Sequence, residues 1–244
     1  MTRLLWSSGT EPRNSEGICV ETQGFNGMKF FCIGLTKTGT TSFNSLMGSI
    51  VYKTHGYSGK LLNEYLDEGG IGPSIRRAID RHDAFDDWPW PFLYRELLQE
   101  FGDDAVFVLT RRSSPEAWLA SIKRYSLSAR TQSIRQATYG TEFPHGFEEH
   151  YLTRYNNHLK EVRAHFGEAG AMNQLIDVEI GSPEMLDAIA KLTNRQIPDQ
   201  SVPRQNPTIP HERVARENIR KINRTLLGLG KRPITLQEAG FRES

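Results

Sequence analysis

The sequence predicts an α/β domain with a mostly parallel central sheet flanked by helices. Two buried strands are the clearest signs: an apolar run closed by glycine at 29–35, K-F-F-C-I-G-L, and a second run at 105–110, A-V-F-V-L-T. Continuous apolar runs of this length are typical of strands covered on both faces. Helical patterns lie between the strands, and such alternation favours a parallel sheet.

Weaker segments complete the predicted sheet. N-Q-L-I-D-V-E-I at 173–180 predicts another strand, and S-I-V-Y-K-T-H at 49–55 is a candidate for one more. D-A-F-D-D at 83–87 is a brief candidate, which W-P-W-P at 88–91 ends because proline cannot donate to a sheet ladder. Ligands bind beyond the carboxyl ends of such strands, so we expect 34–41, 86–87 and 111–112 to face one crevice.

Apolar residues at helical spacing predict the helices around the sheet. Two of them begin with S-P-E, at 114–116 and 182–184, where serine caps the helix and proline suits its first position. Residues 126–146 lack clear periodicity and contain glycines and a proline, which predicts a long loop or lid. The other predicted helices lie at 40–47, 60–66, 74–82, 93–101, 147–166 and 211–226.

Length and composition bound the class of protein. The 244 residues suit one domain, placed at 28–244, after a polar extension at 1–27 that need not be ordered. Lys and Arg number 30 and Asp and Glu 29, which argues against a general nucleic-acid or membrane-surface binder. The 2 cysteines and the lack of a run near the ~20 apolar residues of a membrane span favour a cytoplasmic protein.

A strand-to-helix loop at 31–42, F-C-I-G-L-T-K-T-G-T-T-S, carries the strongest chemical signal. Gly34 and Gly39 have the G-x-x-x-x-G spacing of a phosphate loop, but nucleotide triphosphatases place lysine directly after the second glycine. Here Lys37 comes two residues before Gly39. The glycines, the helix start and the lysine charge favour phosphate binding over a plain turn with a solvated lysine. The candidate residues are Lys37, Thr38, Gly39, Thr40, Thr41 and Ser42.

The K-T-G-T-T core resembles the loop of sulfotransferases that use 3′-phosphoadenosine 5′-phosphosulfate (PAPS), in which the lysine also precedes the glycine. The order of segments over most of 28–206 is similar to one branch of that family. The resemblance implies a P-loop-like sulfotransferase fold with PAPS as co-substrate and without a metal. It also implies that Lys37 contacts the phosphosulfate, while Gly39, Thr40, Thr41 and Ser42 surround the 5′-phosphate.

The same family holds the donor's 3′-phosphate with an arginine at a strand end and a serine on the next helix. The segment at 106–121 has this layout, with Arg111 or Arg112 and then Ser121, against the alternative of exposed arginines and a surface serine. Ser121 follows Arg112 by nine residues and Arg111 by ten, where the family has eight, so the choice stays open with Arg112 preferred. The family's late R-K-G segment has no clear match, and Lys231–Arg232 is a poor substitute.

Sulfuryl transfer to a hydroxyl benefits from a base that takes the acceptor proton. Many family members place a histidine before a proline at this point of the chain, and Asp87 falls at that position. Burial beside tryptophans would raise the pKa of this carboxylate. A helix cap or a turn explains the presence of an aspartate at this position equally well. His55 is the second candidate base. Nearby aromatic residues form either an acceptor pocket or part of the core: Tyr57, Trp88, Trp90 and Phe92.

These observations predict a sulfotransferase that moves a sulfuryl group from PAPS to a hydroxyl or amine of a small-molecule or glycan acceptor. A small-molecule kinase with a degenerate phosphate loop is the alternative enzyme. A silent module that kept a nucleotide pocket is the alternative from another class. Neither a nucleic-acid nor a membrane partner is expected, and the acceptor and the oligomeric state stay open.

Overall fold

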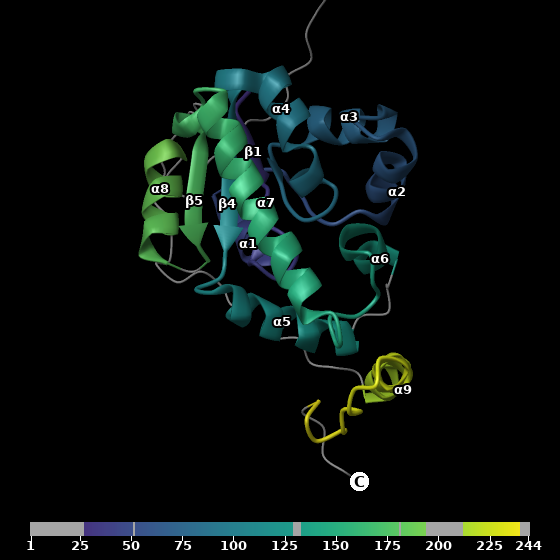
Figure 1. Ribbon diagram of the computed structural model, residues 1–244. Coiled ribbons are helices and arrows are strands. Elements are labelled where there is room, and N and C mark those ends of the chain that lie inside the picture. Colours follow the sequence, from purple (N-terminus) through teal and green to yellow (C-terminus); the bar gives the residue numbers. More distant parts are fainter. Residues whose placement is uncertain (1–26, 51, 129–132, 181, 194–211, 240–244) are drawn as a thin grey trace, which may run out of the picture.

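The computed structural model describes residues 27–50, 52–128, 133–180, 182–193 and 212–239 (Figure 1). Its parallel strands form one sheet in the order β2-β3-β1-β4-β5, and they are β1 (Lys29–Cys32), β2 (Thr54–His55), β3 (Ala84–Phe85), β4 (Ala105–Arg111) and β5 (Leu175–Glu179). The predicted α/β class with a parallel sheet is therefore confirmed. The predicted extension at 1–27 lies outside the described residues except for its last position.

The helices agree with most of the predicted segments. They are α1 (Thr40–Ser49), α2 (Gly59–Glu68), α3 (Pro73–Arg81), α4 (Tyr94–Phe101), α5 (Pro115–Ser128), α6 (Ser133–Tyr139), α7 (Glu148–Glu168), α8 (Pro183–Thr193) and α9 (Glu212–Gly228). Short 3₁₀ turns follow β3 and precede β4 and β5, at η1 (Trp90–Phe92), η2 (Gly102–Asp104) and η3 (Met172–Gln174).

Helices cover both faces of the sheet. Since successive strand residues point to opposite sides, each face has its own hydrophobic cluster. On one face Phe31 and Phe107 pack in a cluster that includes residues of α4 and α7, and Figure 1 shows α7 crossing in front of β1 and β4. On the other face Phe30 and Val106 pack in a second cluster with residues of α1 and α8. This double cover explains why the central strands are mainly apolar.

Two predicted segments differ from the structure. Among the described residues of the candidate strand at 49–55, strand is found at Thr54–His55, and Ser49 is the last residue of α1. The loop predicted at 126–146 is wrong in part, since α5 runs to Ser128 and α6 occupies Ser133–Tyr139. A helix of seven residues is too short to show a clear 3.6-residue period, and its packing against the rest of the chain determines its place.

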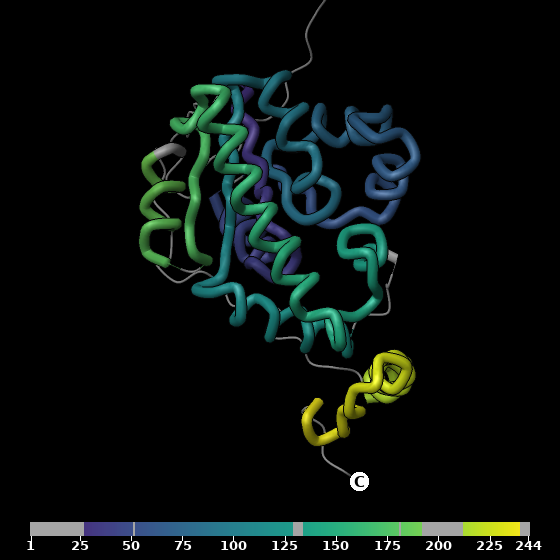
Figure 2. Tube along the Cα trace, in the orientation of Figure 1, coloured from purple at the N-terminus to yellow at the C-terminus, as the bar shows by residue number. Residues whose placement is uncertain are grey.

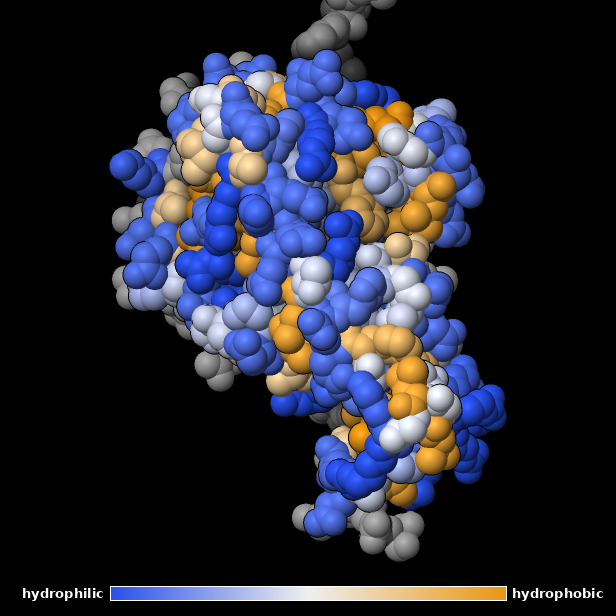
Figure 3. Space-filling model, viewed as in Figure 1, coloured by the Kyte–Doolittle hydropathy of each residue, from blue (hydrophilic) through white to orange (hydrophobic). Residues whose placement is uncertain are grey.

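The C-terminal helix α9 lies beyond the end of α5 (Figure 2). The Asn218 side-chain amide donates to the carbonyls of Ser126 at 3.1 Å and Leu127 at 3.0 Å, which fastens α9 to that end. Hydrophobic atoms gather on the exposed surface there, including Leu227 and Leu229, whereas the surface over α7 is largely hydrophilic (Figure 3). Within the described residues, no helix combines the length and apolar character needed to cross a bilayer.

Candidate functional site

The loop between β1 and α1 is shaped by two glycines that no other residue could replace without displacement. Gly39 has a φ of 102°, and a Cβ built on it would lie 2.0 Å from Ile180 Cγ1. A Cβ on Gly34 would lie 2.1 Å from Thr110 Oγ1. Because the loop is pressed against the ends of β4 and β5, its path from strand to helix is fixed by packing as well as by sequence.

Side chains from distant parts of the chain form hydrogen bonds that hold this loop in place. The Trp88 indole N–H donates to Thr36 Oγ1 at 2.7 Å, and the Trp118 indole N–H donates to the Thr36 carbonyl at 3.0 Å. Thr38 is fully buried, and its hydroxyl bonds the Leu35 carbonyl at 2.6 Å. The predicted loop residue Thr38 therefore contributes its hydroxyl to the loop's own structure, whereas Thr41 is exposed and Ser42 is half-buried.

Lys37 lies at the turn of this loop in a left-handed backbone conformation with φ of 73°. A non-glycine residue in that region carries strain that its surroundings must hold, and such residues gather at functional sites. Its ammonium lies 5.0 Å from the centre of the Tyr125 ring. Burial lowers the pKa of Lys37, the charge of Arg112 lowers it further, and Asp87 raises it.

Arg112, one of the two candidate arginines, joins this lysine to α5. Its Nε donates to the Lys37 carbonyl at 2.7 Å, and its Nη2 lies 3.5 Å from Ser121 Oγ. Arg111 instead bonds Asp177 on β5 at 3.1 Å, and Arg163 bonds the same carboxylate at 2.6 Å. The structure thus brings Arg112, Ser121 and the loop together and engages Arg111 in a separate ion-pair network.

A further arginine, Arg124, adds its charge to those of Lys37 and Arg112. Its charge lowers the pKa of both Lys37 and Arg112. Arg124 is three residues after Ser121 on α5, so the two lie on one helix face, a spacing from which it could have been found. The start of α1 adds to this field, because the N–H groups of Thr40 and Thr41 begin the helix and have no acceptor within it.

Two adjacent carboxyls follow β3 in different surroundings. Asp87 has a φ of 64°, accepts a hydrogen bond from the Trp88 N–H at 3.0 Å, and lines a cavity beside the loop. Burial raises the pKa of Asp87 to about 6, against the opposing effects of that hydrogen bond, one from Thr36, and the Lys37 charge. Asp86 is buried with its Oδ1 2.5 Å from Asn44 Nδ2, and burial raises its pKa to about 7.

The second candidate base, His55, is not among the described residues that line this cavity. Its ring makes edge contacts with His82 at 4.9 Å and Trp90 at 5.9 Å between centroids. Burial lowers the pKa of His55, and the neighbouring His82 lowers it further. The structure therefore separates the two candidate bases and gives only Asp87 a place on the cavity wall.

The cavity beside the loop has a volume of about 190 Å³. Tyr57 and Trp88, two of the predicted pocket residues, line it, whereas Trp90 is fully buried and Phe92 stacks on the ring of Tyr65 at 5.1 Å. Several lining residues were missed by sequence reasoning. They are Thr36, Ile122, Tyr125, Ile134, Arg135 and Tyr139.

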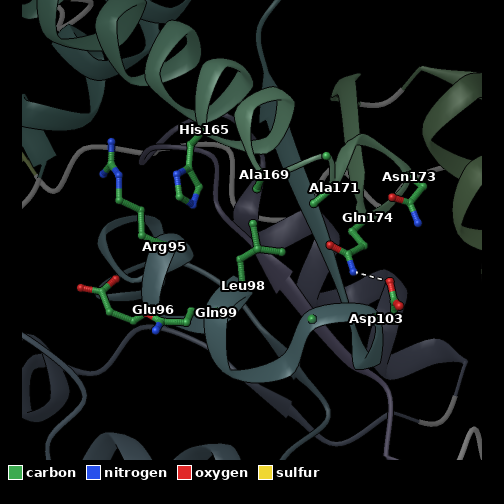
Figure 4. A pocket seen from close by; sticks show the side chains of 12 residues that line it. Arg95, Glu96, Leu98, Gln99, Asp103, His165, Ala169, Ala171, Asn173 and Gln174 are labelled. Atoms are coloured by element: carbon green, nitrogen blue, oxygen red, sulfur yellow. Dashed lines mark hydrogen bonds between the residues drawn. The ribbon is translucent and has the colours of Figure 1, made fainter.

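A larger cleft of about 730 Å³ lies near the amino ends of β4 and β5 (Figure 4). It lies among the ends of α4 and α7 and the turns before β4 and β5, where Gln174 donates to Asp103 at 2.8 Å. Neither the phosphate-type loop nor Asp87 reaches it, so size alone does not identify the functional site. Within the described ranges, no three His, Cys, Asp or Glu side chains form a group that could hold a metal ion.

Comparison with known proteins bears on the family of the chain. A search among curated proteins finds no match. The sulfotransferase domain family matches the chain over residues 29–209, from the first strand through the loop, the arginine strand and α8. That match covers most of the sequence, and the chain therefore belongs to the sulfotransferase domain family.

Proposed function

We propose that this protein transfers a sulfuryl group from PAPS to a hydroxyl, or less favourably an amine, of a small acceptor. The observation that carries the proposal is the position of Lys37, which precedes Gly39 and is joined through its carbonyl to Arg112. A kinase loop would present a lysine after Gly39, at the position that Thr40 occupies.

The residues around the loop fit a donor that carries two separate anionic groups. Lys37 and the first N–H groups of α1 suit the 5′-phosphosulfate, because amides at a helix start and a cation both favour an anion. Arg112 and Ser121 suit the 3′-phosphate, since a guanidinium can bind phosphate oxygens in a bidentate manner. The charges of Arg112 and Arg124 lower the pKa of Lys37, and the charge of Arg124 lowers the pKa of Arg112, which indicates excess positive charge that such a donor would neutralise.

The donor supplies an activated sulfuryl group, and the chain supplies charge and proton transfer. Asp87, in its ionised form, takes the proton from the acceptor hydroxyl. The acceptor oxygen then forms its bond to sulfur as the bond from sulfur to the bridging phosphate oxygen breaks. Lys37 stabilises the negative charge that collects on that oxygen, so the leaving group departs as 3′-phosphoadenosine 5′-phosphate (PAP).

The test is transfer of radiolabelled sulfate from PAPS to a panel of hydroxyl and amine acceptors. We expect labelled product with the wild-type chain and a loss of at least about 100-fold in Lys37→Ala, since removing a group that stabilises transition-state charge has that effect. Lys60→Ala is the matched control, because Lys60 is exposed on α2 away from the loop. PAP binding without transfer to any acceptor would instead support a silent module.

A further inference from the structure

The cavity beside the loop has a size and lining that suit one aromatic ring. Its volume of about 190 Å³ is below the roughly 300–1,000 Å³ of most ligand pockets, which excludes a glycan chain from its interior. For comparison, an apolar cavity of about 150 Å³ holds one benzene molecule. Its walls include the rings of Tyr57, Trp88, Tyr125 and Tyr139, and aromatic walls favour stacked or edge contacts with another ring.

One wall of this cavity holds a buried cation, Arg135. Its side chain belongs to a residue only 3% exposed, and its Nε donates to the Glu142 carbonyl at 2.6 Å. The guanidinium lies 5.9 Å from the centre of the Tyr125 ring and 5.6 Å from that of Phe143. Across the described residues, Arg135 forms no ion pair with a carboxylate, although the charge of Glu142 raises its pKa against the larger effect of burial.

Two hydrogen-bond donors at this wall lack a partner among the described residues. They are the Nη2 of Arg135 and the hydroxyl of Tyr139, both buried. These residues are one helical turn apart on α6, and both line the cavity. Burying a charge or a polar group without a partner is costly, so a ligand that supplies acceptor oxygens and negative charge would be strongly favoured here.

The carboxyl group of Asp87 belongs to a residue that lines the same cavity. The charge of Asp87 raises the pKa values of Tyr125 and Tyr139, whereas the charge of Arg135 lowers both. The Arg135 guanidinium lies 5.9 Å from the centre of the Tyr125 ring, and both tyrosines line the cavity together with Asp87. A ligand in this cavity can present a proton-bearing group to Asp87 and an anionic group to Arg135.

We propose that the acceptor is a monocyclic phenol that carries a carboxylate, held by Arg135 and Tyr139 with its hydroxyl toward Asp87. This inference rests on the proposed function, which it deepens by naming the acceptor class. The phenol oxygen forms the new bond to sulfur, its proton goes to the Asp87 carboxylate, and the sulfur–oxygen bond of PAPS breaks to release PAP. The product is an aryl sulfate that retains its carboxylate, so charge and atoms balance.

The first experiment measures binding and does not require turnover. 4-Hydroxybenzoate and its neutral analogue 4-hydroxybenzamide are titrated calorimetrically into the full chain without nucleotide. We expect the carboxylate to bind at least about tenfold more tightly, because charge-assisted hydrogen bonds are about twice as strong as neutral ones. Arg135→Gln should reduce this preference to about twofold or less, and Tyr139→Phe should reduce it partially.

Arg220→Gln is the matched control, since Arg220 is exposed on α9 outside the cavity and should leave the preference unchanged. Equal binding of the two probes by the wild type would overturn the inference, as would a preference that persists in Arg135→Gln. If that variant fails to fold, the probe comparison in the wild type and in Tyr139→Phe still decides the question.

A second measurement separates this inference from the proposed function. Both probes are offered as acceptors with radiolabelled PAPS, and 4-hydroxybenzoate should give the higher kcat/KM, with the difference mainly in KM. Tight binding of 4-hydroxybenzoate without sulfuryl transfer to any acceptor would retain the assignment of the cavity and refute the proposed function. Transfer to phenols with no preference for the anion would support the proposed function and refute the carboxylate site.

Discussion

Replacing Arg112 tests how the chain would hold the donor's 3′-phosphate. Its guanidinium is fixed by the Nε bond to the Lys37 carbonyl at 2.7 Å, with Nη2 directed toward Ser121. A hydrogen bond to a charged group contributes about 1.5–3 kcal/mol, so Arg112→Ala should weaken PAP binding by about 10- to 150-fold. Arg112→Lys should recover only part of this loss, because an ammonium keeps the charge but not the bidentate fork.

Isothermal titration calorimetry with PAP and with adenosine 5′-monophosphate gives a specific readout. The second nucleotide lacks the 3′-phosphate, so Arg112→Ala should weaken its binding by no more than about threefold, the modest effect of a more distant charge. Arg111→Ala is the matched control, because Arg111 is paired with Asp177 and should alter PAP affinity little. A larger loss of PAP affinity in Arg111→Ala than in Arg112→Ala would instead assign the 3′-phosphate to Arg111.

Three further predictions concern the base and the loop. The pKa of Asp87 is raised to about 6, so kcat/KM should fall about tenfold per pH unit below that value as the carboxylate becomes protonated. Asp87→Asn should remove this acidic limb, and a limb that persists in the variant would exclude Asp87 as the base. His55→Ala should leave kcat within about twofold, because His55 lies outside the cavity wall; a loss equal to that in Asp87→Asn would contradict this placement. Gly39→Ala should lower the free energy of unfolding by more than about 1 kcal/mol in urea denaturation, because φ is 102° and the Cβ would meet Ile180. Unchanged stability with normal PAP affinity would show that the loop tolerates the side chain.

The fold and the phosphate-type loop could be predicted because their determinants are local. The apolar run before Gly34 and the K-T-G-T-T core lie within a few residues of each other, and the S-P-E start of α5 is equally compact. Patterns of this kind depend on backbone geometry and burial, which can be predicted well from short stretches of sequence. The strands at 105–110 and 173–180 were found for the same reason, and the structure has them at β4 and β5.

The choice between Arg111 and Arg112 depended on contacts between distant segments. The same is true of the residues that line the cavity. Arg111 and Arg112 are adjacent, and only the pairing of β4 with β5 places Asp177 beside Arg111. The cavity likewise combines Tyr57 before α2 with Arg135 on α6, a helix hidden within a segment predicted as a loop. Such long-range assembly leaves no periodic trace in the sequence, so these parts required the structure.

We propose that the loop around Lys37 binds a phosphosulfate donor and not a nucleoside triphosphate. Its most direct test is a calorimetric titration of the wild-type chain with PAP and, separately, with ATP and Mg²⁺. We expect saturable binding of PAP to one site without added metal, at an affinity at least about tenfold above that for ATP·Mg²⁺. Binding of ATP·Mg²⁺ with no detectable binding of PAP would contradict it.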